Sequence, residues 1–374
     1  MTTAARILVV DDEHGMVRAV ERVLGGDHEV IGSHSSSQAL EVARRFAPDL
    51  VILDVRMPEI DGFELMARLK AELPGVDIIV MTGSLDDLDQ KLIRAIRGRA
   101  FYFIQKPFDR EVLLTLVERC LELRWRRLEG RRHVARLEKE LAEARAFQQG
   151  LLPLRDMTID RLAVSCRYAS CVELGGDLCD YVAIGNGRIA LLVADVMGHG
   201  VSAAMLTGVV KSAFRASSPD LYEPRAMVNR LWANMDAFGA ERFVTLIAAV
   251  VSLADRRVEY VNAGHPAGLI FRARQGLSRL ATTGPLVSSA FRDCTWDQRF
   301  APFEPGDRLL LYTDGVSDAV AGPDDDGEDA IVRMVQEHAA ADGALLDSLV
   351  AQVQARFGGR PQPDDLTLLS VVMP

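Results

Sequence analysis

The first 120 residues alternate short apolar runs with stretches in which apolar positions recur at helical spacing. The apolar runs are residues 7–10, 50–53, 76–81 and 101–104, and the best amphipathic stretches between them are residues 17–24 and 63–73. Strands that alternate with helices of about ten residues predict a parallel sheet with helices on both faces. We therefore expect a doubly wound α/β domain at the N-terminus.

A long helix is predicted next, because residues 110–152 contain no proline and Gly130 is the only glycine before Gly150. Two apolar stripes follow 3–4 spacing and change phase near Gly130. They consist of Leu121, Trp125 and Leu128, and then Val134, Leu137, Leu141, Ala144, Gln148 and Leu151. This pattern predicts a coiled-coil seam with a register slip, ended by Pro153. We expect a parallel homodimer through residues 121–151.

From Asp156 onward, short strand-like runs dominate and helical stretches are inserted between them. The predicted strands are residues 188–196, 243–253, 258–262, 308–312 and 366–372, and a helix rich in small residues is predicted over 201–216. The pattern divides the chain into an α/β domain (1–120), a coiled-coil linker (121–151) and an α+β domain (152–374).

Composition narrows the class of protein. The chain has 374 residues, 49% of them apolar, a net charge of −10 and 6% aromatic residues. An acidic chain with few aromatic side chains and no basic recognition helix argues against nucleic-acid binding. The longest apolar run, 246–253, is too short to cross a membrane. The five cysteines are odd in number and form no CxxC pair, so we interpret them as free thiols of a cytoplasmic protein.

Reactive side chains follow the strands of the predicted parallel sheet. They are Asp11, Asp12, Asp54, Thr82 and Lys106. Ligands bind beyond the carboxyl ends of such strands, and three neighbouring carboxylates repel one another unless a cation lies among them. The set predicts a Mg²⁺ site with Asp54 as a nucleophile towards a phosphoryl group. Lys106 and Thr82 would contact the phosphoryl oxygens, and Lys106–Pro107 is a candidate cis peptide.

The C-terminal region repeats another pattern, in which an aspartate stands at the edge of an apolar strand. The segments are LGGDLCDY (174–181), LLVADVMGHG (191–200), LLLYTDGVSDA (309–319) and QPDDLTLLSVV (362–372). Carboxylates without His or Cys partners at ligand spacing favour Mg²⁺ or Mn²⁺ over Zn²⁺. Two such ions would activate a bridging water for attack on a phosphate ester.

Residues 5–120 resemble a two-component receiver domain. The matching stretches are LVVDDE (8–13), LVILDVRMPEIDG (50–62), VMTG (80–83) and FIQKPF (103–108). The resemblance implies phosphotransfer from a sensor histidine kinase to Asp54. It also implies that the backbone carbonyl of Arg56 joins Asp11, Asp12 and Asp54 around Mg²⁺. Thr82 and Phe103 would form the switch pair.

Residues 152–374 resemble the SpoIIE-like branch of the PPM family of metal-dependent protein phosphatases. Further matching stretches are AFQQGLLP (146–153), FVTLIAAVV (243–251), VNAGHPAGLI (261–270) and PGDRLLLYTDGV (305–316). The resemblance implies a β-sandwich flanked by helices and two Mn²⁺ or Mg²⁺ ions at one end of it. The implied ligands are Asp177, Asp195 as the bridging carboxylate, the carbonyl of Val196, Asp314 and Asp364, with Asp365 as the alternative to Asp364.

Together the two resemblances imply a response regulator whose output is dephosphorylation of phosphoserine or phosphothreonine on a partner protein. The family analogy points to a STAS-type anti-sigma-factor antagonist as that partner. The alternative is a degenerate phosphatase that acts as a phospho-regulated binding module. Diguanylate cyclase chemistry is disfavoured, because Leu178 and Cys179 follow the GGD segment. We expect Asp180 in an outer shell of the metal site, and His199 and His265 to order loops.

Overall fold

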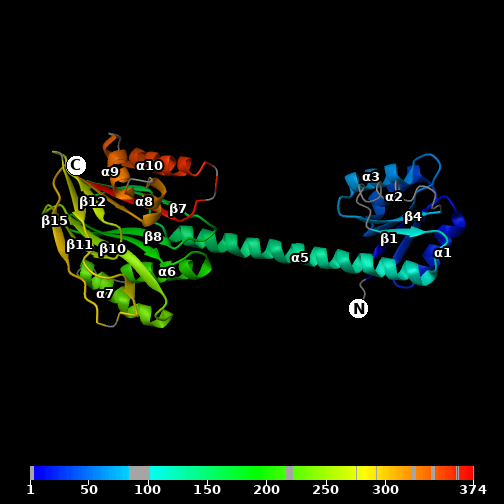
Figure 1. Ribbon diagram of the computed structural model, residues 1–374, viewed down its shortest axis with the longest axis horizontal. Helices are drawn as coiled ribbons and strands as arrows, with labels where there is room; N and C mark the ends of the chain where they lie inside the picture. Colours follow the sequence, from blue (N-terminus) through cyan, green and yellow to red (C-terminus); the bar gives the residue numbers. More distant parts are fainter. Residues whose placement is uncertain are drawn as a thin grey trace. The chain divides into compact units, whose positions relative to one another are not determined.

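The structure is a computed structural model (Figure 1). It describes residues 4–83, 102–215, 222–274, 276–291, 293–321, 326–337, 342–358, 360 and 362–373. The chain forms two compact units, residues 1–137 and 138–374, and the division between them falls inside the predicted linker. Each unit is described by itself.

The N-terminal unit is built on a parallel five-stranded sheet in the order β2-β1-β3-β4-β5. Its strands are β1 (Arg6–Val10), β2 (Glu29–Ser33), β3 (Leu50–Asp54), β4 (Asp77–Thr82) and β5 (Tyr102–Gln105). Its described helices are α1 (His14–Leu24), α2 (Ser36–Phe46), α3 (Gly62–Glu72) and the beginning of α5 (Arg110–Leu151). Helices α1 and α5 pack on one face of the sheet, and α2 and α3 pack on the other. The prediction of a doubly wound α/β domain is confirmed.

Helix α5 is continuous from Arg110 to Leu151, close to the predicted bounds. Its first apolar stripe does not face outward, because Leu121 is buried in the N-terminal core and Trp125 packs against that core. Arg124 adds an ion pair of 3.0 Å to Asp49. The expectation that this stripe belongs to an intermolecular seam is therefore wrong: the unit's own sheet covers it.

The second apolar stripe of α5 is largely exposed, unlike the first. Val134, Leu137 and Leu141 are 54%, 44% and 36% exposed. Gln148, placed in the same stripe by its spacing, is instead buried within the C-terminal unit. The exposed part of the predicted seam thus ends before Gln148.

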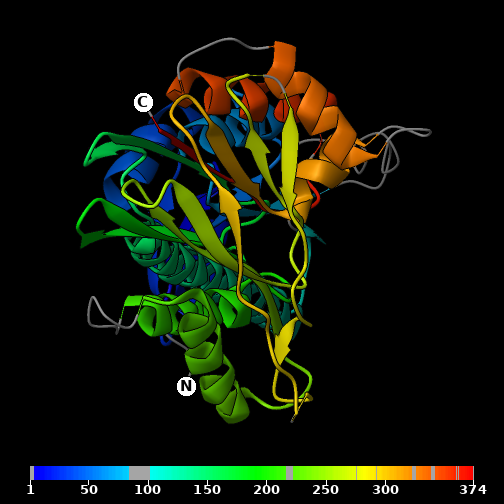
Figure 2. The ribbon, with the colours of Figure 1, turned by 90° about the vertical axis from the view of Figure 1, so that its left-hand side faces the viewer.

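The C-terminal unit, which faces the viewer in Figure 2, is a sandwich of two sheets. The first sheet has the order β15-β11-β10-β9-β8, with β14 paired to β10, and the second has the order β13-β12-β16-β17-β7-β6. The strands of the first sheet are β8 (Asp177–Gly185), β9 (Arg188–Val196), β10 (Phe243–Ser252), β11 (Arg257–Ala263), β14 (Val287–Ser288) and β15 (Arg299–Pro302). The strands of the second are β6 (Asp156–Ile159), β7 (Leu162–Ala169), β12 (Gly268–Phe271), β13 (Leu277–Leu280), β16 (Arg308–Tyr312) and β17 (Leu366–Val372).

Helices cover both outer faces of the sandwich. Helices α6 (Val201–Arg215) and α7 (Pro224–Met235) pack on the first sheet, and a short 3₁₀ helix, η2 (Asp236–Phe238), follows α7. Helices α8 (Asp314–Val320), α9 (Gly327–Glu337) and α10 (Asp342–Arg356) pack on the second sheet. Every neighbouring pair of strands in the two sheets is antiparallel. The predicted β-sandwich flanked by helices is confirmed.

The interior between the two sheets contains a disulfide. Cys166 on β7 and Cys179 on β8 are bonded, and both are buried in the core shared by the sheets. The expectation of five free thiols is wrong for this pair, because the fold brings together two strands from opposite sheets whose spacing in the chain carries no pairing signal. Cys120, Cys171 and Cys294 are free.

In the part of the chain that the structure describes, no helix has the length and apolar character needed to span a membrane.

Candidate metal centres

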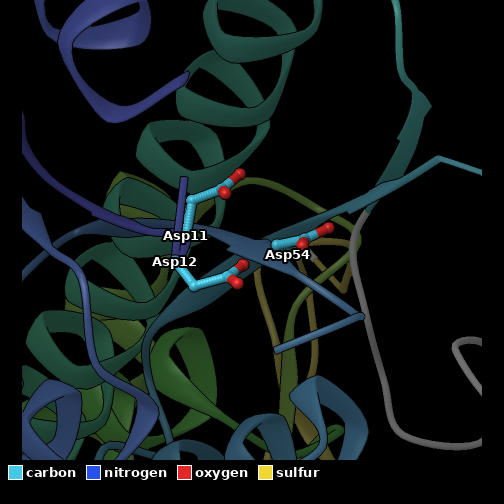
Figure 3. A group of neighbouring side chains, drawn as sticks. All are labelled: Asp11, Asp12 and Asp54. Atoms are coloured by element: carbon cyan, nitrogen blue, oxygen red, sulfur yellow. The ribbon is translucent and has the colours of Figure 1, made fainter. Parts of the chain in front are cut away.

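The ends of β1 and β3 bring three carboxylates together. Asp11 and Asp12 follow β1, Asp54 ends β3, and one oxygen from each side chain lies within 4.8 Å of the others. Figure 3 shows the three side chains directed into the same space. Asp11 and Asp54 are buried, whereas Asp12 is exposed. Carboxylate oxygens with an exposed side suit Mg²⁺, which retains some of its water.

Lys106 places a cation inside this acid cluster. Its Nζ lies 2.6 Å from Asp11 Oδ2 and 3.2 Å from Asp54 Oδ1. Burial raises the pKa of Asp54, and the charge of Lys106 opposes that rise. Burial acts to lower the pKa of Lys106, but the hydrogen bond to Asp11 and the charge of Asp54 outweigh it, so the pKa is raised. The Lys106–Pro107 peptide is cis, as the sequence predicts.

The remaining predicted residues of this centre lie at the same edge of the sheet. Thr82 ends β4, and its buried hydroxyl has no hydrogen-bond partner. Such a group is able to donate to an incoming phosphoryl oxygen. Phe103 on β5 is 41% exposed, and Arg56 is an exposed residue two positions beyond β3.

A second group of carboxylates lies at one end of the sandwich. Asp177 and Asp195 are direct neighbours across the β8–β9 pair. They share a face with the side chains that fill the space between the sheets, because Leu191 and Val193 alternate with outward-facing residues along β9. Asp177 Oδ2 accepts hydrogen bonds of 2.7 Å from both Thr313 and Thr367, which stand on the second sheet's side. Asp177 thereby joins the two sheets.

Asp364 and Asp365 are adjacent but do different things. Asp365 is buried, and its carboxylate accepts hydrogen bonds from the backbone of Gly176 at 2.6 Å and of Cys171 at 2.8 Å. Asp364 is exposed, and one of its oxygens accepts a hydrogen bond from the Asp365 backbone. Asp365 is thus occupied in holding the loop before β8, and Asp364 has an oxygen available.

Two glycines allow the backbone segments of this centre to approach one another. A Cβ on Gly176 would lie 2.5 Å from the carbonyl oxygen of Val196, and one on Gly315 would lie 2.0 Å from that of Asp365. Neither contact is possible for a larger residue without a backbone shift. The GGD and DG motifs therefore mark close approaches of the backbone that place Asp177, Val196 and Asp314 in one region.

The electrostatics of this cluster favour bound cations. Burial, and then the negative charges of Asp314, Asp364 and Asp365, raise the pKa of Asp195 to about 7. Burial also raises the pKa of Asp314, and the Asp364 charge adds to the rise. The pKa of Asp177 is held well above its usual range by burial and by Asp195. Within the described residues, none of these three carboxylates forms an ion pair with a basic side chain.

The donor set fits Mg²⁺ or Mn²⁺, since it consists of carboxylate oxygens and one backbone carbonyl. Only the N-terminal acids, among the described residues, bring three ligand oxygens within 4.8 Å of one another. The C-terminal carboxylates are therefore spread more widely than Asp11, Asp12 and Asp54.

Asp180 does not lie with this cluster, contrary to our expectation. It lies three positions after Asp177, an odd number, so the alternation along β8 turns its side chain to the opposite face. There it is completely buried and pairs with Lys211 at 2.9 Å and Arg215 at 2.6 Å on α6. Asp180 therefore anchors α6 to the sheet and does not belong to an outer shell of the metal site.

His265 makes hydrogen bonds that order its loop, as expected, whereas the expectation for His199 stays a prediction. His265 is buried, its Nδ1 lies 2.9 Å from the Thr245 hydroxyl, and its backbone N–H donates to Asn262 Oδ1. Burial lowers the pKa of His265 to about 3, so its ring is neutral near pH 7. His199 is exposed in the loop after β9.

Three functional contacts escaped sequence reasoning. Thr313 and Thr367 hold Asp177, and Gln148 of α5 bonds the backbone of Gly175. The threonines beside Asp314 and Asp365 offered a weak signal, because hydroxyls often hydrogen-bond buried carboxylates. The hydrogen bonds of Gln148 could not be predicted, because its spacing placed it in the apolar stripe of the helix.

Two family models match the chain. The model of "Stage II sporulation protein E (SpoIIE)" matches residues 185–374, which is just over half of the sequence. The chain belongs to the SpoIIE family. The model of the response regulator receiver domain matches residues 7–118. The C-terminal unit is thus a SpoIIE-type PPM phosphatase domain and the N-terminal unit carries a receiver domain, so the chain is a response regulator.

Three curated relatives each match part of the chain. Phosphoserine phosphatase RsbP of Bacillus subtilis is 31% identical over 191 residues, which are 49% of this chain and 46% of RsbP. Protein IcfG of Synechocystis is 25% identical over 62% of this chain and 41% of IcfG. The transcriptional regulatory protein GlrR of Escherichia coli is 33% identical over 32% of this chain and 26% of GlrR. The chain spans less than half the length of each of these relatives.

A solved structure agrees in fold with the SpoIIE-type domain. The SiaA-PP2C domain of Pseudomonas aeruginosa superposes with a TM-score of 0.56 at 20% identity, and the match covers 65% of this chain and 99% of that domain. At this level of identity the likeness concerns the fold alone.

Proposed function

We propose that this protein is a response regulator whose output is metal-dependent dephosphorylation of phosphoserine or phosphothreonine on a partner protein. The observation that carries the proposal is the group of carboxylates at one end of the sandwich. Asp195 and its neighbours have raised pKa values and, in the described residues, no basic partner. An acid cluster that is not neutralised by protein groups is suited to holding divalent cations.

In this proposal Asp177, Asp195, the carbonyl of Val196, Asp314 and Asp364 hold two Mn²⁺ or Mg²⁺ ions, with Asp195 between them. Bound ions of this kind supply an activated water for in-line attack on a phosphate ester. Thr313 and Thr367 fix the orientation of Asp177 through its Oδ2 atom. Asp365 supports the site by holding Gly176, which leaves the ligand role to Asp364.

We propose that the receiver domain regulates this activity through Asp54. A sensor histidine kinase would phosphorylate Asp54 while Asp11, Asp12, Asp54 and the carbonyl of Arg56 hold Mg²⁺. Lys106 is within 3.2 Å of the Asp54 carboxylate and could pair with the phosphoryl oxygens. The unpartnered Thr82 hydroxyl could donate to another oxygen, and the exposed Phe103 ring would respond to its movement.

The substrate proposal rests on analogy. The name of RsbP describes a phosphoserine phosphatase, and it matches half of this chain. We propose a phosphorylated protein of the STAS-type anti-sigma-factor antagonist class as substrate, so that dephosphorylation would change which partner it binds. The three-part division at 1–120, 121–151 and 152–374 remains part of this proposal.

A homodimer through α5 is also part of the proposal. Val134, Leu137 and Leu141 form an exposed apolar stripe, and burying such a stripe against a second copy contributes about 25 cal/mol per Å². Light scattering should give twice the monomer mass, and Leu137→Asp with Leu141→Asp should return the monomer. A wild-type monomer at all concentrations would reject the dimer.

The central experiment measures Mn²⁺-dependent release of phosphate from a phosphorylated STAS-type protein and from p-nitrophenyl phosphate. The protein is compared with and without a phosphoryl mimic, beryllium fluoride, on Asp54. Turnover that requires Mn²⁺ and responds to the mimic supports a regulated phosphatase. Tight binding of the phosphorylated partner without turnover would favour the alternative of a binding module.

A further inference from the structure

Gln148 stands apart from the rest of the second half of α5. The residues from 129 to 147 are exposed except for Ala144, which is half-buried. Gln148 is only 7% exposed, whereas the adjacent Gln149 is exposed. A buried amide on an otherwise solvated helix requires hydrogen-bond partners, since an unpaired buried polar group is costly.

The two shorter hydrogen bonds of Gln148 join it to both backbone groups of one residue, Gly175. Its Nε2 donates to the carbonyl of Gly175 at 2.7 Å, and the Gly175 N–H donates to its Oε1 at 3.1 Å. Nε2 also lies 3.5 Å from the hydroxyl of Thr207 on α6. Only a side chain with a donor and an acceptor on one planar group can make this reciprocal pair.

Gly175 belongs to the short segment that carries the proposed metal ligands. The next residue, Gly176, donates its N–H to Asp365 at 2.6 Å and accepts a hydrogen bond from the Val196 N–H at 3.1 Å. Asp177 follows directly. The peptide held by Gln148 is therefore one residue from the strand that presents Asp177, and it is tied to the backbone of Val196.

The backbone of Gly175 is closely packed against two side chains. A Cβ on Gly175 would lie 2.2 Å from both Asp365 Oδ2 and the Tyr168 hydroxyl oxygen. Asp365 and Tyr168 thus leave no room beside the Gly175 Cα, and Gln148 bonds both backbone groups of Gly175. We call this combination of packing and hydrogen bonds the Gly175 clamp.

We propose that Gln148 is a positioning residue for the phosphatase metal site, one that links the end of α5 to the segment bearing Asp177 and the Val196 carbonyl. The inference rests on the proposed function. Through this clamp, the affinity of the site for divalent cations depends on how the end of α5 is seated. Groups that orient metal ligands typically change metal affinity by about 10–100-fold when they are lost.

The test compares Gln148→Met and Gln148→Glu with the matched control Gln149→Met in the full-length chain. Methionine preserves length without either hydrogen bond, and an ionised glutamate preserves length and the acceptor without the donor. Thermal unfolding and circular dichroism establish that each variant is folded. Binding of Mn²⁺ is measured by the electron paramagnetic resonance of the free ion. Asp195→Ala is measured in parallel to subtract binding at the receiver.

Both Gln148 variants should bind Mn²⁺ at the Asp195-dependent site about 10–100-fold more weakly than the wild type. Amide hydrogen exchange at Gly175 should also become faster in Gln148→Met, which lacks the acceptor for the Gly175 N–H. Turnover of p-nitrophenyl phosphate at saturating Mn²⁺ should stay within about threefold of the wild type, because the ligands themselves remain. Gln149→Met should match the wild type in all three measurements.

Unchanged Mn²⁺ affinity in folded Gln148→Met, with or without faster exchange at Gly175, would overturn the proposal. If the wild type binds Mn²⁺ in an Asp195-dependent way but hydrolyses no phosphate ester, the proposed function fails and the affinity comparison still decides the role of Gln148. If the wild type shows no Asp195-dependent Mn²⁺ binding, the metal site itself is refuted and this inference with it.

Discussion

The two acid clusters of this protein differ in how the repulsion between their carboxylates is offset. In the receiver domain Asp11, Asp12 and Asp54 converge within 4.8 Å, and Lys106 lies between two of them. In the SpoIIE-type domain the carboxylates are spread more widely, and within the described residues no basic side chain pairs with them. One cluster thus contains its own counter-charge, whereas we propose that the other is neutralised by bound cations.

This difference bears on what each site is expected to do. In the receiver cluster, the charge of Lys106 offsets part of the negative charge of Asp11 and Asp54. The wider cluster has carboxylates whose pKa values rise together, as Asp195 and Asp314 show. Such a site is stable when it is protonated or metal-loaded, so its state follows the metal and the pH.

The largest expected effect comes from Asp195→Ala, which removes the carboxylate at the centre of the wider cluster. We expect Mn²⁺-dependent turnover of p-nitrophenyl phosphate to fall by about 10³-fold or more, as for the loss of a group that acts as a unit with others. Phosphorylation of Asp54 should be unaffected. Retained Mn²⁺-dependent turnover in a folded Asp195→Ala protein would show that the cluster is not the catalytic centre.

Asp54→Asn should act on the other cluster alone. The amide is not a nucleophile, so labelling by acetyl phosphate or by a cognate kinase should disappear. Basal phosphatase turnover should persist in the same protein, because the wider cluster is intact. Base-labile labelling equal to that of the wild type would place the phosphoacceptor elsewhere.

Lys106→Met tests whether the built-in cation is what distinguishes the receiver cluster. It leaves Asp11, which is fully buried, without its ion-pair partner, and we expect a loss of about 2–3 kcal/mol of unfolding free energy. Saturating Mg²⁺ should restore most of the loss, because the ion then supplies the missing positive charge.

Lys139→Met is the matched control for this comparison. Lys139 makes an exposed pair of 3.8 Å with Glu143 on α5, and such pairs contribute little. Urea unfolding of both variants with and without Mg²⁺ measures the difference. A loss in Lys106→Met that Mg²⁺ does not reduce would mean that Lys106 stabilises the receiver for another reason.

The fold was predictable from the sequence in segments whose apolar positions follow one clear strand or helix pattern. The buried strands β1, β3 and β4 are continuous apolar runs, and α5 was predicted close to its observed ends. Strand β2 and helix α2 were not assigned, because β2 exposes four of its five positions fully or in part and has no clear period.

The candidate sites were predictable only at the level of residue type. Asp177, Asp195 and Asp314 could be named from their place at strand ends, but the different roles of Asp364 and Asp365 depend on which carboxylate reaches Gly176. Asp180 could have been excluded by strand alternation alone. The disulfide and the burial of Gln148 depend on contacts between segments distant in the chain, which no local pattern encodes.

The smallest expected effect is a change of stability with pH in the metal-free protein. Burial and neighbouring acids raise the pKa of Asp195 to about 7, whereas its unfolded value is near 3.8. The folded state therefore holds the proton more tightly, and stability is lost as the pH rises towards and through 7. In EDTA, we expect the melting temperature of the SpoIIE-type domain to fall by roughly 2 °C between pH 6.5 and 8.0. His265 opposes this trend in part, because its folded pKa is lowered to about 3 while unfolded histidine is still half protonated at pH 6.5, so its contribution to stability grows until about pH 8. With saturating Mn²⁺ the trend should reverse, since the ions bind deprotonated carboxylates. In metal-free Asp195→Ala, the melting temperature should change less with pH than in the wild type. A wild-type melting temperature that does not change with pH in EDTA would mean that burial and neighbouring acids do not raise the pKa of Asp195.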